Sequence, residues 1–302
     1  MLLKRVFIVR RTISSYMEDR LIEETVIALL RRSVAVLPPD VLAALEGSML
    51  IERDPLARRE LERIIANVKE AGACTLPMCQ DTGLPVFFVK MGFTVPGFEE
   101  SVARGVHRAT HEIPLRKNVV HPITRANTGD NTGKGMPYIY YSCEASGHID
   151  ITVMPKGGGS ENMSALAMLN PSAGIAGVKR FVLDTVVGAG SKPCPPVILG
   201  VGIGGTADEC MALAKKAVLR PVGSRNPDRD VARLEMELLH AINRTGIGPM
   251  GLGGDTTALG VQAEYACCHT ASLPVAVIFQ CYAARRAHAR IYEDGSVELG
   301  GE

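Results

Sequence analysis

The stretch from Gly188 to Cys210 constrains the fold of this chain most strongly. Within it, Cys194 lies between prolines, whose rings fix the backbone torsion φ and remove amide donors, so its thiol is presented in one direction. An apolar run at residues 197–201 follows and predicts a buried strand. Because Thr206 is a good helix N-cap with acids in the turn after it, the stretch predicts a strand, a glycine turn and a helix.

Three glycines in this turn have the spacing of a dinucleotide-binding fingerprint: Gly200, Gly202 and Gly205. In that fingerprint, glycines let the backbone approach a pyrophosphate at a helix N-terminus. A second parallel strand should then follow the helix, but a polar loop at residues 221–228 and another helical pattern come instead. The missing strand counts against NAD binding. The alternative interpretation of the glycine spacing is a tight turn that packs against its own sheet.

Length and composition predict a globular protein with a sizeable core. The chain has 302 residues, 46% of them hydrophobic, which suffices for one large domain or two smaller ones. A net charge of +1 gives no sign of nucleic-acid binding. No apolar run approaches the roughly 20 residues that cross a bilayer, so we expect no membrane association. Eight cysteines without a secretory signal predict a reducing compartment, the cytoplasm.

The chain is expected to have a helical N-terminal lobe followed by a mixed α/β region. Residues 1–16 are basic and lack acids, as in a transit peptide, but we favour an early start codon because a helical pattern begins at Met17. Apolar residues recur at helical spacing through residues 17–75. Residues 76–302 alternate strands, helices and glycine-rich loops, which gives an α/β fold class.

Several elements of the second region are predicted individually. Residues 138–143 and 149–154 are expected to be strands joined as a hairpin, and the turn at residues 293–296 to close another. Further strands are predicted at residues 86–89 and 273–279, and helices at residues 99–112, 207–220 and 231–242.

Two polar loops are candidates for function. Cys79, Gln80 and Asp81 follow one another on a loop bounded by prolines and a glycine, and a core has no reason to contain such a compact polar site. Lys156 is followed by three glycines, whose successive amides make a nest for an oxyanion such as a carboxylate or phosphate.

The cysteines suggest a metal cluster. No Cys-x-x-Cys occurs, which argues against a zinc knuckle or a thioredoxin-like site. Cys79, Cys194 and Cys281 lie in rigid or strand-end settings. Three thiolates can hold a [4Fe-4S] cluster and leave one iron open as a Lewis acid for a substrate carboxylate and hydroxyl. The other five are interpreted as small core residues: Cys74, Cys143, Cys210, Cys267 and Cys268.

Four motifs together resemble the iron-sulfur class I fumarate hydratases and L-tartrate dehydratases, in the family's order, over residues 17–300. They are Cys79-Gln-Asp-Thr-Gly, Lys156-Gly-Gly-Gly-Ser-Glu-Asn, Cys194-Pro-Pro followed by Gly-Gly-Thr, and Gln280-Cys281-x-Ala-x-Arg. The resemblance implies a [4Fe-4S] cluster on the three cysteines Cys79, Cys194 and Cys281. It places the family's acid on Asp81 and its dicarboxylate contacts on Gln80, Arg116, Gly158 and His269.

The resemblance also implies a partner. Full-length class I fumarases have a second domain with a catalytic base threonine and more basic substrate contacts, before which this chain ends. It therefore resembles an alpha subunit, and we expect a beta subunit to complete the active site, as an alpha2-beta2 heterotetramer.

The implied reaction is the reversible hydration of fumarate to L-malate, a step of the tricarboxylic acid cycle. Dehydration of L-tartrate to oxaloacetate is the alternative. More remote alternatives are a cluster-binding protein without catalysis and an NAD-binding oxidoreductase.

Overall fold

The computed structural model describes residues 7–300, with side chains from residue 19 onward. The chain forms two compact units. Among the described residues, unit 1 comprises 7–36, 71–156 and 285–300, and unit 2 comprises 37–70 and 157–284. Each unit combines helices with a sheet, and helices dominate the described N-terminal part, so the predicted α/β class is confirmed. The units cut across the boundary expected after residue 75, and part of the expected extension at residues 1–16 lies outside the described residues.

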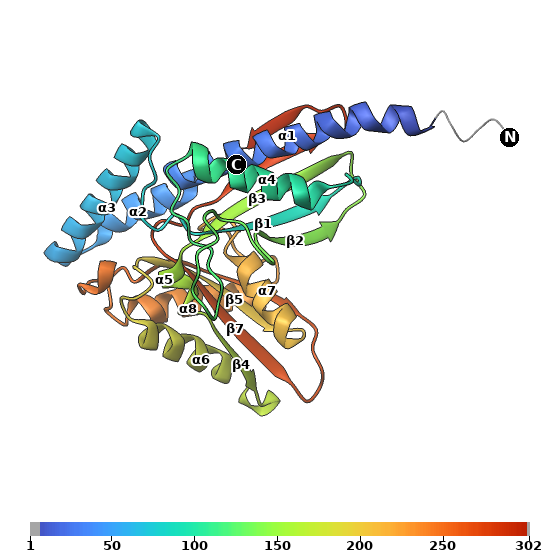
Figure 1. Cartoon of the computed structure of the whole chain (residues 1–302). Coiled ribbons are helices and arrows are strands. Elements are labelled where there is room, and N and C mark those ends of the chain that lie inside the picture. The colour runs from blue at the N-terminus through green and yellow to red at the C-terminus, as the bar shows by residue number, and fades with distance from the viewer. Residues whose placement is uncertain (1–6, 301–302) are drawn as a thin grey trace. The chain divides into compact units, whose positions relative to one another are not determined.

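Unit 1 is a five-stranded sheet with helices on one face (Figure 1). The strand order is β2-β1-β3-β8-β9. The strands are β1 (Leu84–Met91), β2 (Tyr138–Cys143), β3 (His148–Lys156), β8 (Ala287–Tyr292) and β9 (Val297–Gly300), and the helices are α1 (Phe7–Ala35) and α4 (Phe98–Glu112). Leu29 of α1 and Val102 of α4 pack on Phe87 and Ile151 of the sheet, and all four are fully buried. This face holds the core of unit 1.

Both strands of the predicted hairpin at residues 138–154 exist, but their pairing was predicted wrongly. Strand β1 lies between them, parallel to β2 and antiparallel to β3. The connection from β2 to β3 crosses the end of β1 at Gly92, where a Cβ atom would lie 2.1 Å from the His148 carbonyl oxygen. Only glycine leaves room for that crossing. The hairpin expected at residues 293–296 does form, between β8 and β9.

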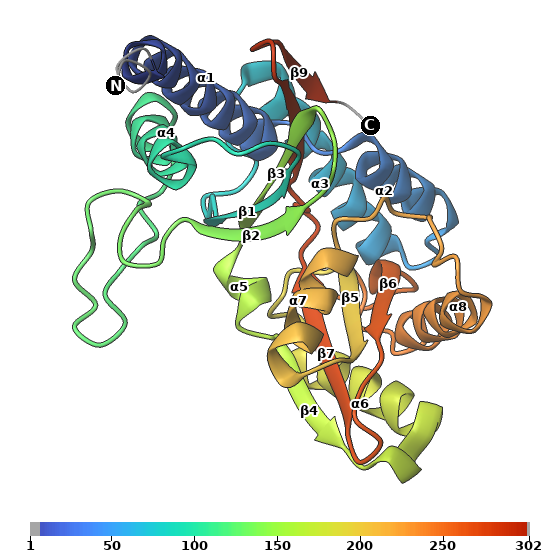
Figure 2. The same cartoon turned by 90° about the vertical axis from the view of Figure 1, so that its right-hand side faces the viewer.

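Unit 2 is a four-stranded sheet, in the order β4-β7-β5-β6, with helices on both faces (Figure 2). Its strands are β4 (Ala165–Leu169), β5 (Val197–Gly204), β6 (Ala258–Ala266) and β7 (Leu273–Gln280). Helices α6 (Gly174–Ala189) and α8 (Arg229–Asn243) pack on one face, and α7 (Ala207–Ala217) packs on the other. The sequence reading did not anticipate β4, β6 and α6.

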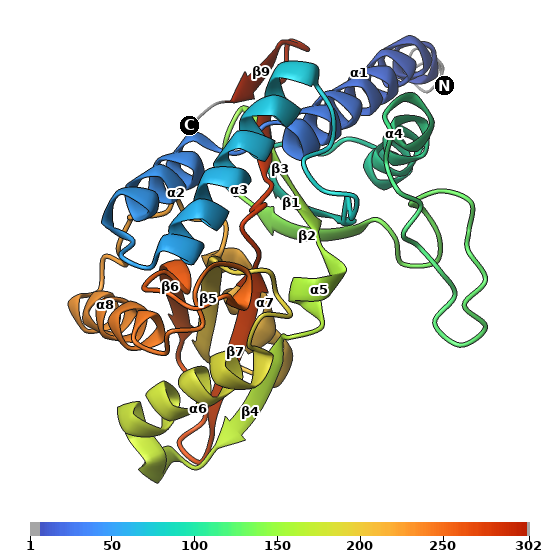
Figure 3. The same ribbon diagram turned by 90° about the vertical axis from the view of Figure 1, so that its left-hand side faces the viewer.

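Two further helices of unit 2 come from the N-terminal part of the chain. Helix α2 (Pro39–Ile51) and most of α3 (Pro55–Cys74) lie side by side (Figure 3). An ion pair of 2.6 Å joins Lys69 Nζ to Glu46 Oε1 between them. The Asp40 carboxylate, at the start of α2, accepts the Val222 amide proton at 2.7 Å. These contacts attach the two helices to the rest of unit 2.

The glycine fingerprint is explained by helix packing. A Cβ atom on Gly200 would lie 2.0 Å from the Ala214 carbonyl oxygen, and one on Gly202 equally close, at 2.0 Å, to the Cys210 carbonyl oxygen. Helix α7 therefore rests directly on the backbone of β5. A parallel strand, β6, does pair with β5, but it follows α8 rather than α7. The close contact between β5 and α7 accounts for Gly200 and Gly202, and it does so without a bound nucleotide.

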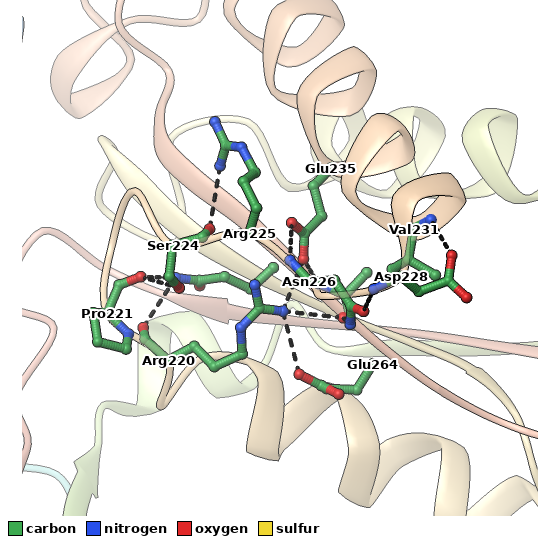
Figure 4. Close-up of polar contacts among 11 residues, drawn as sticks. Arg220, Pro221, Ser224, Arg225, Asn226, Asp228, Val231, Glu235 and Glu264 are labelled. Atoms are coloured by element: carbon green, nitrogen blue, oxygen red, sulfur yellow. Dashed lines mark hydrogen bonds and ion pairs between the residues drawn. The ribbon is translucent and has the colours of Figure 1, made fainter.

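The polar loop at residues 221–228 is held in place by hydrogen bonds that involve a buried carboxylate of α8 (Figure 4). Glu235 of α8 is fully buried and accepts Arg220 Nη1 at 2.8 Å and the Asn226 amide at 3.1 Å. Arg220 Nη1 also donates to Glu264 of β6 at 3.2 Å. A buried charge is tolerated only when it is paired and hydrogen-bonded, so these contacts fix the loop between the two helices.

One helical stretch, Asp19–Ile51, is long and apolar enough by length and composition to cross a membrane, although the sequence reading expected none. This is weak evidence, since core helices meet the same criterion. Val26 and Leu30 of the stretch are buried in the core of unit 1, and Leu45 is fully buried in unit 2. These three apolar side chains are thus used for packing, whereas Leu50 and Ile51 at the end of the stretch are exposed.

The contact between β5 and α7 predicts the effect of adding one methyl group. Gly202→Ala should destabilise the protein by about 1–3 kcal/mol, because the contacting atom belongs to the backbone and cannot rotate away. The matched control is Gly188→Ala in α6, where nothing lies within 4 Å of the added Cβ atom, so stability should rise by roughly 0.5–1 kcal/mol. Urea unfolding of both variants measures this, and equal midpoints would contradict the close contact.

Candidate active site

The loop that carries Cys79 and Asp81 is held in one conformation by its own polar groups. Asp81 Oδ1 accepts the Gly83 amide proton at 3.0 Å and Asn118 Nδ2 at 3.2 Å. Gly83 has a φ of +83°, and a Cβ atom there would lie 2.6 Å from the Pro155 carbonyl carbon, so only glycine fits. Asp81 is half-buried, so its carboxylate lies near the surface of unit 1, and the two hydrogen bonds fix its position there.

Arg116 is fixed to the same loop through its backbone. Its amide donates to Thr82 Oγ1 at 3.0 Å, and its carbonyl oxygen accepts Asn131 Nδ2 at 3.1 Å. The side chains of Arg116 and Gln80 are exposed, as a role in binding an incoming anion requires. Unit 1 thus brings together four of the predicted site residues: Cys79, Gln80, Asp81 and Arg116.

Arg285 is a site residue that the sequence reading missed. It closes the motif that begins at Gln280, but no role was assigned to it. Its side chain is only 2% exposed, and Nη1 donates to the Asp81 carbonyl oxygen. Two donors therefore hold Asp81 from different elements, Asn118 on the side chain and Arg285 on the backbone. The sequence feature that could have identified it is its place soon after Cys281, at the end of the motif that begins at Gln280.

Cys194 and Cys281 lie together in unit 2. The amide of Tyr282 donates to the Cys194 carbonyl oxygen at 3.2 Å, which joins the two cysteine-bearing segments. Cys194 has a φ of +54°, in the left-handed region that residues other than glycine seldom adopt. Residues with such backbone angles cluster at functional sites. The Cys194 thiol is exposed, and Cys281 is half-buried.

Gly158 and His269 fall at different places in unit 2. Gly158 starts the one-turn helix α5 (Gly158–Glu161), and its neighbour Gly159 lies against Lys192, shortly before Cys194. His269 is exposed on the loop before β7, and its Nδ1 accepts the Ala271 amide at 3.0 Å. The eight residues of β7 separate it from Cys281 by about 25 Å, so the two lie at opposite ends of the sheet.

None of the eight cysteines, all of which lie among the described residues, forms a disulfide. The prediction that five of them are small core residues is correct for Cys210 and wrong for the others, which are exposed: Cys74, Cys143, Cys267 and Cys268. These four sit at helix or strand ends and in loops, where a small side chain meets solvent. Burial raises the pKa of the Cys210 thiol to about 11, so it stays protonated at neutral pH.

The donor set fits an iron-sulfur cluster in its chemistry. Thiolates are the ligands that such clusters use, and Cys79, Cys194 and Cys281 form no disulfide and are all at least partly accessible. Among the side chains of residues 19–300, no three His, Cys, Asp or Glu groups lie close enough together to hold a metal ion. The three cysteines are divided between the units, Cys79 in unit 1 and the other two in unit 2.

Comparisons with known proteins agree with these features. A profile of the fumarate hydratase (fumerase) family matches residues 23–290. A protein of Methanocaldococcus jannaschii named "Putative L(+)-tartrate dehydratase subunit alpha" is 50% identical over 283 residues, which cover 91% of this chain and 99% of that protein. The L(+)-tartrate dehydratase subunits alpha of Escherichia coli K12 and Shigella sonnei are each 36% identical over 266 residues, which cover 87% of this chain and 88% of theirs.

In unit 1 a fixed carboxylate, Asp81, lies two residues from the accessible Cys79, and unit 2 holds two further accessible cysteines, Cys194 and Cys281. The chain belongs to the fumarate hydratase family and is a hydro-lyase, as its sequence motifs predicted.

Thiol reactivity should separate Cys210 from the candidate ligands. At pH 8 and without metal, iodoacetamide should label Cys194 readily, because it is exposed, and leave Cys210 unmodified, because it is buried and protonated. Peptide mass spectrometry of the folded protein measures both sites. Equal labelling would contradict the burial of Cys210, and exposed Cys143 provides a positive control.

Proposed function

We propose that this chain is the alpha subunit of a two-subunit [4Fe-4S] hydro-lyase that interconverts fumarate and L-malate. The observation that carries the proposal is the placement of Asp81. Its carboxylate is held by Gly83 and Asn118, two residues from a free cysteine and on a loop that also fixes Arg116. A positioned acid beside a candidate ligand and a cationic side chain is the arrangement that loss of water from a hydroxy acid needs.

Cys79, Cys194 and Cys281 would hold the cluster. When bound, the cluster supplies one iron without a protein ligand, a Lewis acid toward the hydroxyl and carboxylate of the substrate. Asp81 donates a proton to the departing hydroxyl, so that water leaves, while a base from the partner subunit removes the proton from the neighbouring carbon. The reverse path adds water to fumarate.

The remaining residues would hold the carboxylates of the substrate. Arg116 has an exposed guanidinium, whose planar fork matches a carboxylate with two parallel hydrogen bonds. Gln80 is exposed beside Asp81, and Gly158 offers a backbone close to the Cys194 segment. His269 lies too far from Cys281 in unit 2 to share one small substrate with it, so its part in binding requires a second chain.

L-tartrate is the second candidate substrate. The relatives described above are named L(+)-tartrate dehydratase subunit alpha, whereas the family description names fumarate hydratase. The two reactions share the loss of water from a four-carbon hydroxy dicarboxylate, and tartrate has one hydroxyl more. The partner subunit would supply part of the pocket and thereby influence this choice.

A beta subunit would complete the enzyme as an alpha2-beta2 assembly in the cytoplasm. The relatives are named as subunits alpha, and this chain aligns with nearly the full length of the Methanocaldococcus jannaschii protein. Eight cysteines that form no disulfide among the described residues are consistent with a reducing compartment.

Substitution of the proposed acid tests the mechanism. In the complex, Asp81→Asn should lower kcat about 10²–10⁴-fold, because the amide keeps the shape of the side chain but cannot donate the acidic proton. Iron and sulfide content should not change. Turnover of L-malate, fumarate and L-tartrate measures the effect and identifies the substrate. Wild-type activity in this variant would defeat the role of Asp81.

Metal analysis tests the cluster and the two remote alternatives. Anaerobically purified wild-type complex should contain about four iron and four sulfide per alpha chain, and Cys194→Ser should lose most of both, whereas exposed Cys143→Ser should retain them. Zinc, or no metal, in every preparation would reject the hydro-lyase mechanism. A cluster without turnover on any of the acids would favour a binding protein, and saturable NAD binding would favour an oxidoreductase.

A further inference from the structure

Asn118 makes a contact that no motif anticipated. Its side-chain amide lies at the base of the segment after α4, where Nδ2 is 3.2 Å from Asp81 Oδ1 and 3.1 Å from the Gly83 carbonyl oxygen. Both partners are oxygen atoms that accept hydrogen bonds. The NH₂ group of the amide must therefore face them, because the carbonyl end would meet two acceptors with no donor.

This contact selects one oxygen of the Asp81 carboxyl group. Oδ1 accepts two N–H donors, one from Asn118 and one from the Gly83 backbone. Neither donor can accept a proton in return. The plane of the carboxyl group is therefore set by the two hydrogen bonds to Oδ1. The direction in which Asp81 delivers its proton thus depends on Asn118.

Asn118 is itself held by a buried residue. Its backbone amide donates to Asn131 Oδ1 at 2.9 Å. Asn131 is 1% exposed, and its Nδ2 donates to Thr110 Oγ1 of α4 and to the Arg116 carbonyl oxygen, each at 3.1 Å. The Asn131 side chain therefore uses both its oxygen and its NH₂ group in hydrogen bonds within unit 1.

The network links the proposed acid to the proposed carboxylate-binding residue. Asp81 is tied to Asn118, and Asn118 to Asn131, which is bonded to Arg116. A second link runs from Thr82, next to Asp81, to the Arg116 amide. The Asp81 carboxylate and the Arg116 backbone, from which the exposed guanidinium extends, are therefore coupled through one hydrogen-bond network.

We propose that Asn118 is a positioning residue for the dehydration, which orients the Asp81 carboxyl group and keeps it in register with Arg116. This inference rests on the proposed function in the assignment of Asp81 as the acid. In this proposal Asn118 acts through the Asp81 carboxyl group rather than on the substrate itself.

Two variants of Asn118 distinguish a role in filling space from a role as a hydrogen-bond donor, because the two roles predict opposite orders of activity. Asn118→Asp has the shape of the natural side chain but places an acceptor against Asp81 Oδ1 and the Gly83 carbonyl oxygen. Asn118→Ala removes the donor and leaves room for water. If the donor matters, Asn118→Asp should be the less active of the two, whereas a packing role would make Asn118→Ala the less active.

The experiment compares these variants with wild type and Asn127→Ala in the complex with the beta subunit. Asn127 is a matched control from the same segment, because its side chain also binds backbone, the Lys117 carbonyl oxygen and the Gly129 amide, each at 2.8 Å, but not Asp81. We expect kcat to fall about 10–100-fold in Asn118→Ala and further in Asn118→Asp, with KM within about twofold of wild type. Asn127→Ala should stay within about twofold in both constants.

A second measurement does not depend on activity. The Gly83 amide proton is hydrogen-bonded to Asp81 Oδ1, so its exchange with deuterium reports on the placement of the carboxylate. Exchange of the peptide that contains Gly83 should be faster in Asn118→Ala than in wild type and unchanged in Asn127→Ala. Iron and sulfide content should be equal in all of them.

The outcomes separate this inference from the proposed function. Wild-type kcat in Asn118→Ala, an Asn118→Ala variant less active than Asn118→Asp, or unchanged Gly83 exchange would each overturn the positioning role. If the wild-type complex dehydrates neither acid, the proposed function fails, and Gly83 exchange still decides whether Asn118 fixes the Asp81 carboxylate.

Discussion

The direct contact between β5 and α7 is the constraint on which the rest of unit 2 depends. Two glycines, Gly200 and Gly202, leave the strand backbone open to the helix, so that the helix backbone itself fills the space of a side chain. The opposite face of the same strand packs Leu199 and Val201 against α6 and α8. Because both faces are occupied, β5 is fixed within its sheet, and the segment that carries Cys194 immediately before it starts from a rigid base.

Hydrogen bonds, rather than apolar packing, define the candidate acid in unit 1. Asp81 receives bonds on its side chain from Gly83 and Asn118 and on its backbone from Arg285. Each donor comes from a different segment, so the position of the carboxylate is a property of the assembled unit. Such arrangements suit catalysis, because the groups are oriented before the substrate arrives and need not be reorganised during the reaction.

The sequence predicted local elements better than their partners. Strands at residues 138–143 and 149–154 were recognised from composition and alternation, but the insertion of β1 between them was not, because strand pairing depends on a distant segment. The glycine spacing was read correctly as a strand, a turn and a helix, while its cause, the contact with α7, appears only in the structure. Exposure of individual cysteines such as Cys143 and Cys267 likewise depends on which loops end at the surface.

The sequence by itself determined the family, the reaction class and the candidate ligands, since these depend on short motifs whose residue types and order are enough to recognise them. It also determined the strand, turn and helix around Cys194, because prolines and glycines restrict the backbone locally. Only the tertiary structure decided that Asn118 and Arg285 hold Asp81 while Asn131 holds Asn118, and that His269 lies at the far end of β7 from Cys281. Those relations join residues distant in sequence, and the energies that select them come from burial and hydrogen bonding in the folded chain.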